Sequence, residues 1–67
     1  MAQICNTLIR LRKKHKLSQE EVAKHIGVTK RTYAGYETGK HKPNLESIIK
    51  LANLYKITID FMIMGFN

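Results

Sequence analysis

The side chains that could bind a charged partner gather on one face of a short segment, residues 30–38. At about 100° per residue, a helix over this segment would turn one set of residues outward, namely Lys30, Arg31, Ala34, Gly35 and Thr38. The opposite face would carry Thr32, Tyr33 and Tyr36. The outward face is polar and basic, and its ammonium and guanidinium groups are hydrogen-bond donors that suit anionic partners.

The net charge of the chain supports the same interpretation. Its 67 residues include 12 Lys and Arg against 5 Asp and Glu, which gives a formal charge of +7. Such a surplus favours polyanions, either nucleic acid or acidic lipid head groups, and does not by itself choose between them. A plainer interpretation, an ordinary solvated basic face, stays open for four lysines: Lys13, Lys14, Lys40 and Lys42.

A helix-turn-helix over residues 19–38 is the element that would position the basic face. Ala23 is small enough to let a second helix approach closely, and Gly27 can take the positive φ that a tight turn needs. Thr29 can then cap the second helix, over residues 30–38. The spacing of these three residues therefore predicts the motif.

The whole chain, residues 1–67, is predicted to be one all-α domain, because apolar residues recur with helical spacing and no segment alternates with strand period. A first helix should end near residue 15 or 16, a fourth should follow a cap by Asn44, and a fifth should cover residues 58–64 and close at Gly65. Ser18 and Glu21 form a capping box, so the second helix should begin at residue 19. We expect the core to contain Ile4, Leu8 and Leu11 of the first helix, Val22, Ala23 and Ile26 of the second, and Leu45, Ile48, Ile49, Ala52 and Tyr55 of the fourth.

Other classes of function find little support in the sequence. The single Cys5 excludes an internal disulfide and, without a signal-peptide or membrane-spanning apolar run, indicates the cytoplasm; we interpret it as core filler rather than a reactive thiol. His15, His25 and His41 match no metal-ligand spacing and are expected at the surface. No nucleophile and base pair, phosphate loop or carboxylate pair stands out. We therefore expect no enzyme, metal, cofactor, small-molecule ligand or membrane association.

Several short motifs together carry a resemblance to a known family. They are Leu11-Arg12, Leu17-Ser18-Gln19-Glu20-Glu21-Val22-Ala23, Gly27-Val28-Thr29, Tyr36-Glu37-Thr38-Gly39-Lys40, Pro43 and Ile59-Asp60. Over roughly residues 4–64 the chain resembles the Cro and lambda-repressor-like family of helix-turn-helix DNA-binding domains, also called the XRE family. It looks most like short phage and prophage repressors of Gram-positive bacteria. The resemblance implies a five-helix fold in which helices two and three form the helix-turn-helix.

The resemblance also implies a role for each residue of the basic face. In the family, helix three enters the major groove of DNA, which assigns base reading to Lys30, Arg31, Ala34 and Gly35. Arg31 is the first candidate, because a guanidinium can donate two hydrogen bonds to guanine O6 and N7. Lys30 could equally contact a phosphate, and Ala34 offers a methyl group to thymine. Gly35 has no side chain and would only permit close approach.

Phosphate contacts and one structural ion pair follow from the same resemblance. Gln19 matches a phosphate-binding position at the start of helix two, where free backbone N–H groups favour an anion. The other candidates for phosphate binding are Ser18, Thr32, Lys40, Lys42 and Asn44. Arg12 and Glu37 occupy positions that form an ion pair in several relatives, tying helix one to the end of helix three. The net contribution of such a pair to stability can be near zero.

Three residues depart from the family pattern. Lys16 stands where many relatives have glycine, so the turn after helix one must either force a positive φ on lysine or use another geometry. Tyr33 replaces an aliphatic anchor, and its hydroxyl needs a partner or solvent. Gly35 in the middle of a helix costs roughly 1 kcal/mol relative to alanine.

These observations predict a transcriptional regulator that binds double-stranded DNA in a sequence-specific manner, as a repressor that competes with RNA polymerase at a promoter. An antitoxin or a restriction-modification controller would use the same DNA site. In a third hypothesis the chain is a protein-interaction module that does not bind DNA.

A homodimer is predicted from helix five. Ile59, Met62, Ile63 and Phe66 share one face that can pack inward, whereas Phe61 and Met64 point away. Two-fold symmetry would present two copies of helix three to a pseudo-palindromic operator. In the alternative interpretation, Phe61 folds back onto helix four.

Overall fold

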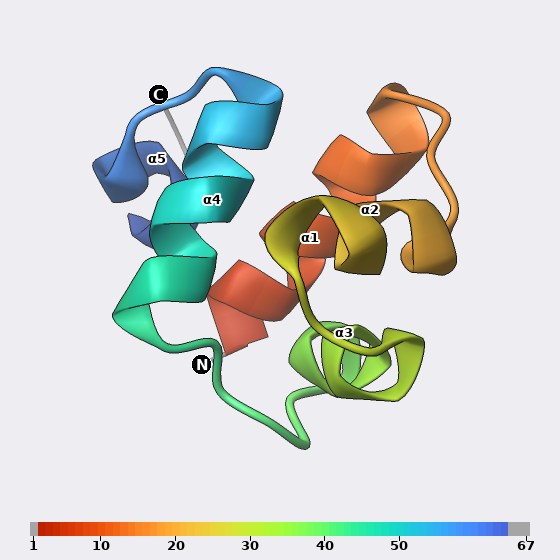
Figure 1. The fold of residues 1–67 in the computed structure, drawn as a ribbon. Helices are drawn as coiled ribbons and strands as arrows, with labels where there is room; N and C mark the ends of the chain where they lie inside the picture. The colour runs from red at the N-terminus through yellow and green to blue at the C-terminus, as the bar shows by residue number, and fades with distance from the viewer. Residues whose placement is uncertain (1, 65–67) are drawn as a thin grey trace.

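The computed structural model describes residues 2–64, and this part of the chain is all helical apart from its turns (Figure 1). The helices are α1 (Ala2–Lys14), α2 (Gln19–Ile26), α3 (Lys30–Thr38), α4 (Leu45–Tyr55) and α5 (Ile59–Met64). This confirms the predicted five-helix, all-α architecture. Figure 1 shows α3 at one end of the molecule, with the segment of residues 39–44 running along the same end to the start of α4.

The helix-turn-helix is fixed by backbone and side-chain hydrogen bonds at its two caps. The Oγ of Ser18 accepts from the N–H of Glu21 at 3.0 Å, and a Glu21 carboxylate oxygen accepts from the N–H of Ser18 at 2.8 Å. Gly27 ends α2 with φ 76°, in the left-handed region. Two residues later, the Oγ1 of Thr29 accepts from the N–H of Thr32 at 3.1 Å and so caps α3. The predicted capping box and turn are therefore present.

The core lies where all five helices meet. α1 packs against α3 and α5, α2 packs against α3 and α4, and α4 packs against α5. The most completely enclosed large side chains include one from each helix: Leu8, Val22, Tyr33, Leu51 and Met62. The predicted inner faces of α1 and α2 are buried as expected, with Ile4, Leu11, Ala23 and Ile26 all 7% exposed or less.

The predicted inner face of α4 is partly wrong. Leu45 is 67% exposed and Ile49 is 40% exposed, whereas Ser47 and Leu51 are buried. At about 100° per residue, the buried side of α4 is rotated away from Leu45 and Ile49 and includes Ser47. The helices that cover α4 are mainly α2 and α5. The Oγ of Ser47 also lies 3.4 Å from the hydroxyl of Tyr36 on α3, which gives this buried polar side chain a partner.

Helix α5 also differs from the prediction. Met62 is fully buried and Ile63 is half-buried, but Ile59 is 36% exposed rather than packed inward. In its first turn the Oγ1 of Thr58 accepts from the N–H of Phe61 at 3.0 Å. Gly65 and Phe66 lie outside the residues that the structure describes.

Two lysines hold a backbone conformation that favours glycine. Lys16 has φ 58° and Lys56 has φ 56°. Each follows a helix whose end is closed in the same way: the N–H of Leu17 donates to the carbonyl of Arg12, and the N–H of Ile57 donates to the carbonyl of Ala52, both at 3.0 Å. The turn after α1 therefore does force a positive φ on Lys16, at a cost of roughly 1–2 kcal/mol for a residue with a Cβ.

Replacing Lys16 by glycine should stabilise the protein. We expect Lys16→Gly to raise the free energy of unfolding by about 0.5–1 kcal/mol, because the relief of left-handed strain exceeds the extra entropy that glycine loses on folding. Urea denaturation measures the change. The matched control is Lys13→Gly, which removes the same charge from a helical position of α1 and should lower stability by about 1 kcal/mol. Equal losses in both variants would contradict the strain at Lys16.

Candidate nucleic-acid interface

Helix α3 turns its basic residues outward at its first turn. Lys30 and Arg31 are exposed, directly after the cap by Thr29, so their charges lie beside the free N–H groups at the start of the helix. The inward-facing residues Tyr33 and Tyr36 are buried. The outer and inner faces predicted from helical spacing are therefore observed for these residues.

The two smallest residues of the predicted face are partly covered. Ala34 is half-buried and Gly35 is buried. Both line a shallow surface hollow of about 380 Å³ between α3 and the segment that follows it, together with Arg31, Thr38, Lys40 and His41. The N–H of His41 donates to the carbonyl of Gly35 at 3.1 Å. The hollow thus combines three of the four predicted base-reading residues with two loop residues, Lys40 and His41, and Lys30 does not line it.

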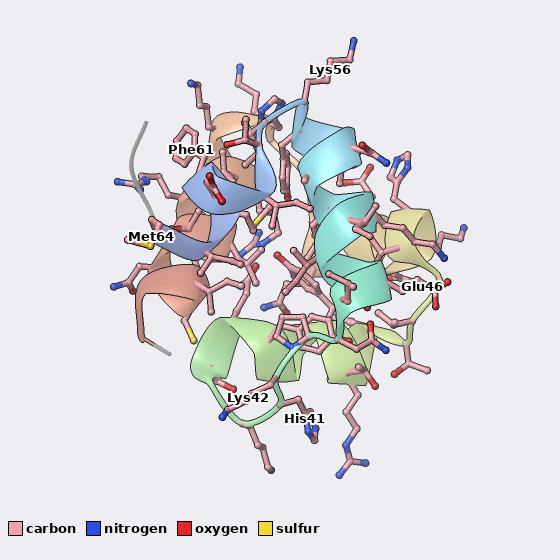
Figure 2. The ribbon with its side chains drawn as sticks, turned by 90° about the vertical axis from the view of Figure 1, so that its left-hand side faces the viewer. His41, Lys42, Glu46, Lys56, Phe61 and Met64 are labelled. Carbon is pink, nitrogen blue, oxygen red and sulfur yellow. The ribbon has the colours of Figure 1, made fainter. Side chains whose placement is uncertain are left out.

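His41 was absent from the predicted site residues. The spacing of the histidines predicts an ordinary surface residue at this position, and His41 is indeed exposed. Figure 2 shows His41 and Lys42 on the side of the molecule where α3 lies, opposite Lys56. No sequence signal finds the contact of His41 with α3, because it depends on how the chain folds back after Gly39, which has φ 83°.

The predicted phosphate-binding residues lie at the start of α2, on α3 and in the segment that connects α3 to α4. Ser18, Lys40, Lys42 and Asn44 are exposed, and Gln19 and Thr32 are half-buried. The side-chain oxygen of Asn44 accepts from the N–H of Ser47 at 2.9 Å, which uses its carbonyl and leaves the amide N–H₂ as a donor. Most of these residues present donor groups, as phosphate oxygens require.

A buried carboxylate, Glu37, joins α3 to α1 and α2. Its side chain is 4% exposed. Arg12 donates to both carboxylate oxygens, from Nε to Oε2 at 2.7 Å and from Nη2 to Oε1 at 3.2 Å. The Tyr33 hydroxyl donates to Oε2 at 2.6 Å, and Gln19 Nε2 donates to Oε1 at 3.0 Å. The hydroxyl of Tyr33 thus has the hydrogen-bond partner that a buried tyrosine needs.

The hydrogen bonds decide the ionisation of Glu37. Burial alone would raise its pKa, but the donors on Arg12, Tyr33 and Gln19 together outweigh burial, and the pKa of Glu37 is lowered. The same contacts act in the opposite direction on Tyr33, whose pKa is raised by burial and then by Glu37. Burial likewise raises the pKa of Tyr55 to about 12. Glu37 is therefore a charged carboxylate at neutral pH.

Gln19 belongs both to this network and to the predicted phosphate contacts. Its amide nitrogen carries two hydrogens, and one of them points to Glu37. The second remains for another acceptor. The hydrogen bond to Glu37 restricts the orientation of the amide, so Gln19 is ordered before any ligand arrives.

Residues 2–64 contain no group of three or more His, Cys, Asp or Glu side chains that could hold a metal ion. In the same residues, no helix is long and apolar enough to cross a bilayer.

Comparison with known proteins identifies the family. A family model described as helix-turn-helix matches residues 8–62. This chain belongs to the helix-turn-helix family. The match covers α2, α3, α4 and parts of α1 and α5, and it confirms the resemblance found in the sequence.

Relatives in this family are described as transcriptional regulators. The chain is 42% identical over 59 residues to an HTH-type transcriptional regulator YobD of Bacillus subtilis, matching 88% of this chain and 53% of that protein. It is 51% identical over 49 residues to the cryptic phage CTXphi transcriptional repressor RstR of Vibrio cholerae, matching 73% of this chain and 44% of RstR. The chain thus spans about half the length of these two relatives.

A relative of similar size and a solved structure complete the comparison. The HTH-type transcriptional regulator MJ0272 of Methanocaldococcus jannaschii is 36% identical over 55 residues, which are 82% of this chain and 83% of that protein. The crystal structure of a transcriptional regulator from Listeria innocua superposes with a TM-score of 0.85 at 36% identity, over 88% of this chain and 55% of that one. The family is therefore one of DNA-binding regulators rather than enzymes, as predicted.

Removing the charge of Glu37 should destabilise the protein in a pH-dependent manner. At pH 7 we expect Glu37→Gln to lower the free energy of unfolding by about 1.5–3 kcal/mol, because Arg12 loses its charged partner. The pKa of Glu37 is lower in the folded chain than its ordinary value of 4.5, so the advantage of wild type is complete above pH 4.5 and disappears as the pH falls through the folded value. Urea denaturation between pH 7 and pH 3 measures the difference in the free energy of unfolding between wild type and Glu37→Gln.

The control for this experiment is Glu20→Gln. Glu20 is exposed on α2, so the variant has the same net charge without touching the network. A difference between wild type and Glu37→Gln that stays constant from pH 7 to pH 3 would show that the ionised carboxylate is not the source of the stability.

Proposed function

We propose that this chain is a sequence-specific regulator that reads double-stranded DNA with α3 in the major groove. The observation that carries the proposal is the exposed pair Lys30 and Arg31 at the start of α3. The turn between Gly27 and Thr29 fixes the direction in which this helix leaves α2. Because the major groove admits an α-helix and presents a distinct pattern of donors and acceptors for each base pair, such a helix can read sequence.

The proposed contacts divide into base reading and positioning. Arg31 donates to O6 and N7 of a guanine, Ala34 contacts a thymine methyl group, and Lys30 reaches a base or a neighbouring phosphate. Phosphate oxygens accept from the free N–H of Gln19 and from the other predicted donors, which are Ser18, Thr32, Lys40, Lys42 and Asn44. Phosphate contacts set the register of the protein on the duplex and contribute most of the salt-dependent affinity.

We further propose that the regulator is a homodimer joined through α5. Met64 is 47% exposed, Ile59 is 36% exposed and Phe61 is half-buried. Figure 2 shows Phe61 and Met64 on the side of the molecule that carries α5. An isologous pair would bury these apolar side chains and set two copies of α3 about 34 Å apart, facing successive major grooves of a pseudo-palindromic operator. Occupation of such an operator within a promoter, in the cytoplasm, would exclude RNA polymerase and repress transcription.

Selection of duplexes from a random library tests this function directly. Repeated rounds of binding and sequencing should yield two inverted half-sites with centres one helical turn apart. Such an operator would establish binding, sequence preference and two-fold symmetry in one experiment. Failure to enrich any sequence, even at low salt, would overturn the proposal.

Alanine variants separate base reading from phosphate binding. On the selected operator, Arg31→Ala should weaken binding by about 1–3 kcal/mol and relax the preference at one base pair of each half-site. Lys42→Ala should weaken specific and random duplexes alike, because a phosphate contact carries no sequence information. Fluorescence anisotropy on both kinds of duplex measures the four affinities. The same loss for both variants on both duplexes would refute this division.

Sedimentation at micromolar concentration tests the dimer. Met64→Glu should dissociate it, because two carboxylates would be buried against an apolar surface. The matched control is Ile49→Glu, which changes an apolar residue of similar exposure on α4, 40% against 47% for Met64, and should leave the dimer intact. If wild type binds the full operator as a monomer, the proposed dimer is wrong. If Ile49→Glu dissociates the dimer and Met64→Glu does not, the interface lies on α4 instead of α5.

A further inference from the structure

One position of the outer face of α3 has no side chain of its own. Gly35 stands one helical turn beyond Arg31 and lies in the same hollow. Glycine is a poor residue for the interior of a helix, and the φ of Gly35 is not in the left-handed region that would require it. The presence of glycine here therefore calls for a packing reason.

The side chain of His41 supplies that reason. A Cβ added to Gly35 would collide with the imidazole: it would contact Cδ2, and it would lie 2.8 Å from Cγ and 3.2 Å from Cβ of His41. The imidazole thus occupies the space into which a side chain at position 35 would project. The backbone hydrogen bond from His41 to the carbonyl of Gly35, at 3.1 Å, holds the loop residue in this place.

The imidazole is also open to a ligand. His41 is exposed, and its ring nitrogens make no hydrogen bond to any residue between positions 2 and 64. The other residues of the hollow are cationic, polar or small, namely Arg31, Lys40, Thr38, Ala34 and Gly35 itself. No carboxylate lines the hollow, so its surroundings suit the electronegative edge of a base.

We propose that His41 reads a base, taking the place of the side chain that α3 lacks at Gly35. The inference rests on the proposed function, because it requires α3 to lie in the major groove. An imidazole N–H at this place donates to N7 of a purine, one helical turn along α3 from the guanine contacted by Arg31. The reading surface is then formed by two segments: Lys30, Arg31 and Ala34 from the helix, and His41 from the loop.

The test compares base preferences of wild type and His41→Ala on the operator selected with the wild-type protein. Each base pair of one half-site is changed in turn, and affinities are measured by fluorescence anisotropy. We expect wild type to bind a purine about tenfold more tightly than a pyrimidine at one position of the half-site. His41→Ala should lose this preference but keep the preference for guanine at the position that Arg31 contacts. Lys42→Ala and His25→Ala are the controls: the first changes a neighbouring loop residue, the second an exposed histidine on α2, and both should keep all preferences.

Each remaining outcome overturns a stated part of the inference. If wild type selects no operator, the proposed function fails and the inference fails with it. If wild type selects an operator and His41→Ala weakens all duplexes equally, His41 contacts a phosphate. If His41→Ala keeps every preference and every affinity, His41 does not contact DNA.

Thermal unfolding checks the packing of His41 on Gly35 without DNA. Gly35→Ala replaces a poor helix former but forces the imidazole of His41 to move. The change should therefore raise the melting temperature less in wild type than in a His41→Ala background, where the atoms nearest to the added Cβ are gone. Equal effects in the two backgrounds would show that the imidazole does not occupy this space in solution.

Discussion

The arrangement of the first three helices depends on one buried charge, the carboxylate of Glu37. An ionised carboxylate is costly to bury unless hydrogen bonds replace its water, and here Arg12, Gln19 and Tyr33 donate the replacements. Arg12 comes from α1, Gln19 from α2 and Tyr33 from α3 itself. Since the loss of any donor leaves a partly satisfied charge in the interior, the three helices must keep their relative positions. The network therefore restricts where α3 can lie.

The same network holds α3 in place beneath the long basic side chains on its outer face. Long basic residues such as Arg31 lose rotamer entropy when they bind. The free energy of binding is most favourable when the helix that carries them does not also have to be ordered. Tyr33 and Glu37 are four residues apart, so one side of α3 is occupied by buried polar contacts. The net contribution of these contacts to stability can be small, as is common for buried ion pairs. Their larger effect is on the geometry of α3.

The sequence predicts those parts of the molecule that local rules govern. Capping residues such as Ser18 and Thr29 mark helix starts because their hydrogen bonds reach only three residues along the chain. Long-range packing is harder to predict. Helical spacing placed Leu45 and Ile49 on an inner face, but burial depends on how many neighbours a small domain has, and no element in the described part of the chain covers them. The same reason applies to Ile59 on α5.

The contact between His41 and Gly35 shows a further limit of reading one element at a time. Helical spacing assigns the outer face of α3 from the residues of α3 alone. A glycine in that face therefore predicts a position without a side chain. The left-handed turn at Gly39 reverses the chain, and the hydrogen bond from His41 to Gly35 returns the next residues to the helix they have just left. A residue six positions later can then fill the gap with an imidazole. The chemical character of this surface is consequently set by a helix and its following loop together, and a substitution in either segment changes what the other presents.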